Sequence, residues 1–224
     1  AAGDAPIDET ADFNPVTPYG ESKVFVERDV TPMADDMFSP TFLRNSTAYG
    51  VSPRLRGDLV VNNLTGYAFT TGEVLLKSDG TPWRPLVHIR DISRAFLTVL
   101  EAPREKVHAK AFNVGSTKEN YRMSEVAEIV ADVVPNSSVT IAEGAGPDKR
   151  CYRVNCDRIT AELGCECERT VRKGVEELYA AYQSHGLTLD EFESGRYLSI
   201  RHEKGLIEDG KLGTDLRFKE TNAA

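Results

Sequence analysis

Tyr19 and Lys23 are the residues of this chain whose types and spacing most directly suggest chemistry. Two residues four apart in a helix lie on the same face, one turn from each other. An ammonium group beside a phenol favours the phenolate form, so the pair is suited to general acid–base catalysis at a hydroxyl group. The same spacing also fits a partly buried tyrosine and a solvated lysine on an ordinary amphipathic helix, so the pair alone does not establish a site.

The residues in front of Tyr19 predict a helix that would hold this pair at the edge of a cleft. Thr17 is suited to cap the helix, and Pro18 fits its first turn. The helical pattern continues to about Arg28. Tyr19 would therefore lie in the first turn of the helix, where a catalytic side chain can reach a bound molecule.

The rest of the sequence alternates short apolar segments with amphipathic ones. This alternation predicts an α/β protein with a parallel sheet. Asp91 is expected to cap the helix that follows one of the strands. We expect strands at 42–43, 74–76, 86–89, 111–115 and 139–141, helices at 18–28, 58–70, 91–100, 123–134 and 170–186, and a helical appendage from about residue 190.

The composition is that of an ordinary globular protein. The 224 residues carry a formal net charge of −8, with 40% hydrophobic and 28% charged residues. A negative chain is a poor partner for nucleic acid or for an anionic membrane surface. No run of 18 apolar residues and no secretion signal occurs, so we expect a cytoplasmic protein.

Four cysteines fall close together near residue 160. Their spacing, with four, eight and one intervening residues, is not a usual zinc pattern, and no histidine lies nearby in the sequence. We therefore expect reduced thiols and no metal site. The four are Cys151, Cys156, Cys165 and Cys167.

Five segments, taken in order, resemble the extended short-chain dehydrogenases/reductases, the family of NAD-dependent nucleotide-sugar epimerases and dehydratases. The resemblance reaches to about Tyr182, and the order of the segments is more specific than any one of them. The segments are Pro18-Tyr19-Gly20-x-Ser22-Lys23, Leu43-Arg44…Tyr49-Gly50, Asp79-Gly80…Arg84…His88-Ile89-x-Asp91, Phe112-Asn113-Val114-Gly115, and Pro147-Asp148-Lys149-Arg150 followed by Leu163-Gly164.

This resemblance implies the C-terminal part of a Rossmann-type doubly wound parallel sheet with a smaller α/β domain for a sugar nucleotide. Residues 1–54 and 84–116 would belong to the Rossmann domain, and residues 55–83 and 117–224 to the substrate domain. The active site would lie between them, at the carboxyl ends of the strands. The family also commonly forms a homodimer through the helix that carries Tyr19 and Lys23.

The resemblance further implies a role for each matched residue. Tyr19 would be the base, and Lys23 would position the ribose of NAD, with NADP as the alternative cofactor. Asn45 and Ser46 would contact the cofactor. A nucleotide-diphosphate sugar would be the substrate, contacted by Thr47, Asn62, Asn63, Arg84 and Arg150.

The sequence also departs from the family pattern. It contains no glycine-rich fingerprint for a pyrophosphate, so we expect the C-terminal part of a longer enzyme, inactive on its own. Thr47 stands where many members carry an asparagine, and Asn45-Ser46 replaces a common aromatic pair. Three functions stay open: an epimerase, a 4,6-dehydratase, and a non-catalytic nucleotide-binding module on the same fold.

Overall fold

The computed structural model of the protein describes residues 5–144, 146 and 151–219. Its helices are α1 (Pro18–Val30), α2 (Val60–Thr71), α3 (Ile89–Glu101), α4 (Arg104–Val107), α5 (Met123–Val133), α6 (Asp157–Leu163), α7 (Val171–His185), α8 (Leu189–Phe192) and α9 (Ser199–Glu208), with a 3-10 turn η1 at Thr31–Met33. Its strands are β1 (Thr41–Asn45), β2 (Thr47–Tyr49), β3 (Glu73–Leu76), β4 (Trp83–His88), β5 (Lys110–Val114), β6 (Asn120–Arg122) and β7 (Ser138–Ile141).

Most strand pairs of the described residues are parallel, which confirms the predicted α/β class. β1 pairs with β5, β2 with β4, and β3 with β7, each in parallel. Only the short β6 runs antiparallel, against the start of β4. Because parallel strands need crossover connections, helices separate the partners of each pair.

Two apolar cores lie on either side of β4. One contains Leu86 and is formed mainly by α2, β3, α5 and α7. The other contains Val87 and is formed by residues of α3, β5 and α6. Consecutive residues of a strand point to opposite faces, so β4 contributes to both cores.

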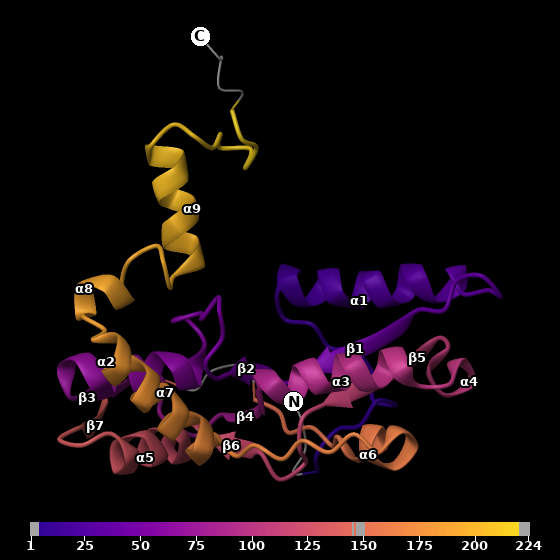
Figure 1. The fold of residues 1–224 in the computed structure, drawn as a ribbon, viewed down its shortest axis with the longest axis horizontal. Coiled ribbons are helices and arrows are strands. Elements are labelled where there is room, and N and C mark those ends of the chain that lie inside the picture. The colour runs from indigo at the N-terminus through magenta and orange to yellow at the C-terminus, as the bar shows by residue number, and fades with distance from the viewer. Residues whose placement is uncertain (1–4, 145, 147–150, 220–224) are drawn as a thin grey trace.

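Helix α1 lies outside these cores. It begins as predicted, because the Thr17 hydroxyl accepts a hydrogen bond from the Gly20 N–H at 3.1 Å. None of its residues is buried, and Figure 1 shows it running along one side of β1. Helix α9, which follows α8, projects away from the rest of the molecule (Figure 1).

The structure corrects one expectation at the start of α3. The helix begins at Ile89, and the residue that caps it is His88, whose Nδ1 accepts a hydrogen bond from the Arg90 N–H at 3.2 Å. Asp91 already lies inside the first turn, so it is not the cap. Its carboxylate instead accepts the Arg169 N–H at 3.1 Å, which ties α3 to the segment in front of α7.

Two negative findings apply to the described residues. No helix among them combines the length and apolar character that a membrane crossing requires. No cluster of three or more histidine, cysteine or acidic side chains within them could hold a metal ion.

Candidate active site

Tyr19 and Lys23 lie together on the surface of α1. The Lys23 Nζ sits 5.0 Å from the centre of the Tyr19 ring, over its face. The Tyr19 side chain is 73% exposed, so its hydroxyl is open to a bound molecule. The predicted pairing of these two side chains on one helical face is therefore confirmed, although the catalytic role itself stays a prediction.

Helix α1 is tied to the sheet through Arg44 of β1. The Arg44 guanidinium binds the Glu27 carboxylate through two hydrogen bonds, from Nε at 3.0 Å and from Nη2 at 2.5 Å. It also donates to the Glu9 carbonyl at 3.0 Å and stacks on the Phe13 ring at 4.6 Å. A single side chain thus fixes both α1 and the segment in front of it.

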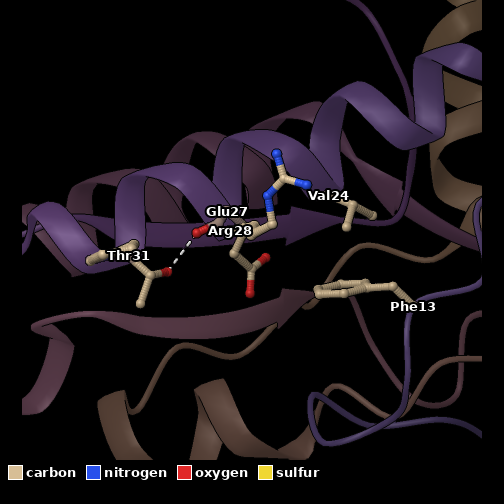
Figure 2. A pocket seen from close by; sticks show the side chains of 6 residues that line it. Phe13, Val24, Glu27, Arg28 and Thr31 are labelled. Atoms are coloured by element: carbon tan, nitrogen blue, oxygen red, sulfur yellow. Dashed lines mark hydrogen bonds between the residues drawn. The ribbon is translucent and has the colours of Figure 1, made fainter.

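A cavity of about 490 Å3 lies beneath α1. Figure 2 shows the side chains that line it. Phe13 and Val24 face each other at one end, and the Thr31 hydroxyl donates to the Glu27 carbonyl at the other, at 2.6 Å. Neither Tyr19 nor Lys23 lines this cavity. It is therefore distinct from the surface that carries the predicted chemistry.

The carboxyl end of β1 carries the three neighbouring residues expected to face cofactor and sugar. Asn45 is exposed at the end of the strand, and Thr47 opens β2. Ser46 between them is buried, with its N–H bonded to the Val114 carbonyl at 2.9 Å. An added Cβ on Gly115 would lie only 2.7 Å from the Ser46 Oγ, so the close approach of the two segments requires glycine there.

Asn62 and Asn63 of α2 hold the connection between β2 and α2, residues 50–59, here called the β2–α2 loop. Asn62 accepts the Gly50 N–H at 2.9 Å and donates to the Arg56 carbonyl at 3.0 Å. Asn63 donates to the Gly57 carbonyl at 2.7 Å. Both amides therefore shape the loop, and their predicted contact with substrate stays untested.

Of the two arginines predicted to bind the substrate, the structure describes Arg84. Arg84 lies near the start of β4, two residues before Leu86, which pairs with Thr47 in the parallel register. Its Nη1 donates to the Trp83 carbonyl at 2.9 Å. Arg84 itself is paired with Tyr121 of β6, whereas Arg150 lies outside the described residues.

Arg56, in the β2–α2 loop, is a positioned cation that the sequence analysis does not single out. It forms a two-point ion pair with Asp58, at 3.0 Å and 2.6 Å. Only the opposite charges two residues apart mark it in the sequence, and that signal is too common to single it out.

A buried polar network stands behind the β2–α2 loop. His88 is completely buried, its ring contacts Tyr49 edge-on at 5.3 Å, and its Nε2 lies 3.2 Å from the Glu177 carboxylate. Glu177 also binds Arg169 at 2.7 Å. Burial lowers the pKa of His88, and the negative charge of Glu177 opposes that shift. The lowered pKa favours the uncharged form of His88.

Comparisons with known proteins identify the family. A sequence model described as the NAD dependent epimerase/dehydratase family matches residues 1–115, just over half of the chain. The match covers α1 with Tyr19 and Lys23 and continues through β5.

Curated relatives include enzymes of both reaction types. The dTDP-glucose 4,6-dehydratase of Escherichia coli is 24% identical over 204 residues, which cover 85% of this chain and 54% of the relative. The UDP-glucose 4-epimerase of Corynebacterium glutamicum is 26% identical over 190 residues, covering 78% and 57% respectively. The chain thus spans about half the length of the curated relatives it matches.

A solved structure supports the same fold. The UDP-glucuronic acid 4-epimerase of Bacillus cereus, in complex with UDP-glucuronic acid and NAD, superimposes with a TM-score of 0.69 at 17% identity. The overlap covers 83% of this chain and 58% of that one. The strands and helices described above therefore have the Rossmann-type fold of that structure. Because the family model matches more than half of its residues, the chain belongs to the NAD-dependent epimerase/dehydratase family.

Proposed function

We propose that this protein is a nucleotide-sugar epimerase that uses Tyr19 as its proton-transferring group and Lys23 as its partner. The observation that carries the proposal is the exposed phenol of Tyr19 with the Lys23 ammonium over its ring, on a capped helix beside the carboxyl end of β1. A non-catalytic module of the same fold would have no use for this pair.

The donor set at α1 fits the ribose of a nicotinamide dinucleotide. In the part of the chain that the structure describes, no carboxylate forms an ion pair with Lys23, so its three N–H donors are available. Lys23 and Tyr19 would hold ribose hydroxyls, and Asn45 and Ser46 would face the nicotinamide end. NAD is the cofactor we propose, since the family is NAD-dependent.

In the proposed reaction Tyr19 removes the proton from a sugar hydroxyl. The electrons of the broken O–H bond form the new carbonyl bond, and the carbon–hydrogen bond breaks at the same time. NAD, when bound, would supply the acceptor for that hydrogen with its electron pair. Lys23, whose Nζ lies over the Tyr19 ring, would hold the cofactor ribose beside the phenol. Return of the hydrogen with its electron pair to the other face of the carbonyl carbon, while Tyr19 gives its proton back to the oxygen, forms the epimer.

The substrate contacts we propose are those expected from the sequence. Arg84 and Arg150 would bind the diphosphate, since guanidinium groups match phosphate oxygens well. Thr47 would face the sugar from the start of β2. Asn62 and Asn63 would act close to the diphosphate, and the hydrogen bonds that they make to the β2–α2 loop support a role in shaping that wall of the site.

Domain organisation, assembly and location are part of the same proposal. Residues 1–54 and 84–116 would belong to the cofactor domain and residues 55–83 and 117–224 to the substrate domain. The two apolar cores follow this division only in part, because Ile159 of α6 packs in the core of α3 and β5, and Tyr49 and Leu86 pack in the other core. We further propose a cytoplasmic homodimer that pairs through α1, whose residues are all at least partly exposed.

A dehydratase is the second candidate, because the Escherichia coli relative that covers 85% of this chain is a 4,6-dehydratase. Product analysis separates the two. The natural protein, in its full length, is supplied with NAD and UDP-glucose, UDP-glucuronic acid or dTDP-glucose, and the products are examined by NMR and mass spectrometry. An epimerase gives an isomer of unchanged mass, whereas a dehydratase gives a product lighter by one water. Absence of both products with all three sugars contradicts the proposed function.

Lys23→Met tests the proposed role of Lys23 as the partner of Tyr19 in the same assay, with Lys77→Met as the control. Lys77 is an exposed lysine beyond the end of β3, away from α1. We expect Lys23→Met to abolish product formation and Lys77→Met to leave it unchanged. Equal activity of the two variants contradicts the role of Lys23.

A further inference from the structure

Helix α9 lacks the packing partner that a helix of its length needs. It has ten residues, none of them buried, and no side chain caps its first turn. None of these residues belongs to either apolar core, and the helix stands away from the rest of the molecule (Figure 1). Isolated helices shorter than about 12–15 residues are marginal in water, because helices in proteins are stabilised mainly by packing of one face. A surface outside the described part of this chain would supply that packing.

The start of α9 is fixed to the body of the protein. The Gly57 N–H of the β2–α2 loop donates to the Tyr197 carbonyl at 2.8 Å, just before the helix. The Arg201 guanidinium, in the first turn, donates to the Glu193 carbonyl at the end of α8, at 2.5 Å. These two bonds set the direction in which α9 leaves the body, so the helix is held in an outward position.

One face of α9 carries an apolar residue at each end and two opposite charges between them. Ile200, Glu203, Lys204 and Ile207 are spaced i, i+3, i+4 and i+7, so they share one side of the helix. Ile200 is 68% exposed, Glu203 and Lys204 are exposed, and Ile207 is partly exposed. Among the described residues, neither charged side chain has an ion-pair partner. We call these four residues the α9 stripe.

The α9 stripe is complementary to itself when two helices run antiparallel. With a twofold axis between positions 203 and 204, Ile200 lies opposite Ile207 of the partner subunit. Glu203 then lies opposite the partner's Lys204, and the same two contacts recur on the other side of the axis, as in any twofold interface. A parallel pair would instead set each charge against its own copy, which is repulsive.

We propose that two copies of this chain associate through α9, antiparallel about a twofold axis. The contact covers Ile200 and Ile207 and pairs Glu203 with Lys204 between the copies. The order of charges along the stripe identifies a second copy as the occupant, since a copy supplies the opposite charge at each position. This contact is separate from the pairing through α1 and does not depend on the proposed function.

The test is sedimentation velocity on the natural protein in its full length. Two ten-residue helices bury less than a standard interface, so the range from about 10 to about 500 µM is the one to cover. Glu203→Lys and Lys204→Glu each place like charges opposite one another in a pair of identical copies. An equimolar mixture of the two variants restores opposite charges at both positions. His202→Lys is the matched control, because His202 is exposed on the other side of α9.

We expect the unaltered protein to reach twice the mass of either single variant at the highest concentration, because like charges oppose the contact. The mixture should regain the mass of the unaltered protein, and His202→Lys should behave as the unaltered protein does. If copies also pair through α1, the same comparison separates a tetramer from a dimer. Recovery in the mixture also shows that each variant is folded.

Two results would overturn the inference. In the first, the unaltered protein is no heavier than Glu203→Lys at any concentration, so no second copy binds α9. In the second, both variants lose mass and the mixture does not regain it, so Glu203 and Lys204 do not face each other between copies. Neither result bears on the proposed function, which the product analysis tests.

Discussion

The Arg44 guanidinium of β1 donates two hydrogen bonds to the Glu27 carboxylate of α1, at 3.0 Å and 2.5 Å. Both side chains are mostly shielded, with 23% and 18% of their surface exposed. Because α1 has no buried residue, this pair is the main polar connection described between the helix with Tyr19 and the sheet.

Arg44→Met should therefore loosen α1 selectively. Removing one partner of a shielded pair leaves the Glu27 charge without compensation, and we expect a loss of about 1–3 kcal/mol in the free energy of unfolding. Urea denaturation measures the loss, and hydrogen exchange should be faster in α1 than in α7. Arg28→Met is the control on the same helix, because the Arg28–Asp29 pair is exposed. Equal unfolding midpoints for the two variants would contradict this account.

His88 should make the stability of the protein depend on pH. Its folded-state pKa is lowered, mainly by burial, so the unfolded chain takes up a proton at higher pH than the folded one. The free energy of unfolding should therefore fall as pH decreases from about 7 through the unfolded pKa of about 6.5. Protonation would also cost the hydrogen bond that the Arg90 N–H donates to His88 Nδ1.

His88→Asn keeps a helix-capping acceptor and removes the titration, so it should flatten this slope. His202→Asn, at an exposed position of α9, should leave the slope unchanged. Urea unfolding at pH steps between about 7 and about 5.5 measures both. A slope that survives in His88→Asn would rule out His88 as its source.

Gly174 of α7 should tolerate no side chain. A Cβ there would lie 2.2 Å from the ring of Tyr49, which is fully buried, so Gly174→Ala must displace packed atoms. We expect a loss of about 1–3 kcal/mol. Gly205→Ala in α9 meets no atom within 4 Å and should be neutral or stabilising by up to about 1 kcal/mol. Thermal unfolding compares the two, and equal effects would show that α7 does not pack on Tyr49 as described.

The cysteines should differ sharply in reactivity. Burial raises the pKa of Cys156 and of Cys167 to about 12, so both thiols stay protonated near neutral pH, whereas Cys151 is exposed. Iodoacetamide at about pH 7.5 should label Cys151 in the folded protein, and Cys156 and Cys167 only after unfolding in urea. Mass spectrometry of the labelled peptides reads the result. Labelling of Cys156 in the folded protein at the rate of Cys151 would contradict the burial described here.

Local signals explain what the sequence could predict. Thr17 and Pro18 specify the start of α1 by short-range capping, so the helix and the shared face of Tyr19 and Lys23 followed from neighbouring residues alone. The apolar strands β1, β3, β5 and β7 were likewise expected close to their observed bounds.

The features that escaped prediction depend on residues distant in the chain. β6 is a short polar strand, Asn120–Arg122, that exists because it pairs with β4. Helix α3 begins at Ile89, so His88 is its cap, and the Asp91 carboxylate instead accepts the N–H of the distant Arg169. Arg56 carries no periodic signal in the sequence, and its ion pair with Asp58 is evident only in the folded β2–α2 loop.

The most direct test of the central claim is the rate of nucleotide-sugar conversion by Tyr19→Phe in the natural protein with NAD. Removing the hydroxyl removes the proton-transferring atom, so turnover should fall about 10²–10⁴-fold while affinity for the sugar nucleotide is retained. Tyr179→Phe on α7 is the matched control and should keep full activity. A Tyr19→Phe protein that turns over as fast as this control would contradict the assignment of Tyr19 and the proposed function built on it.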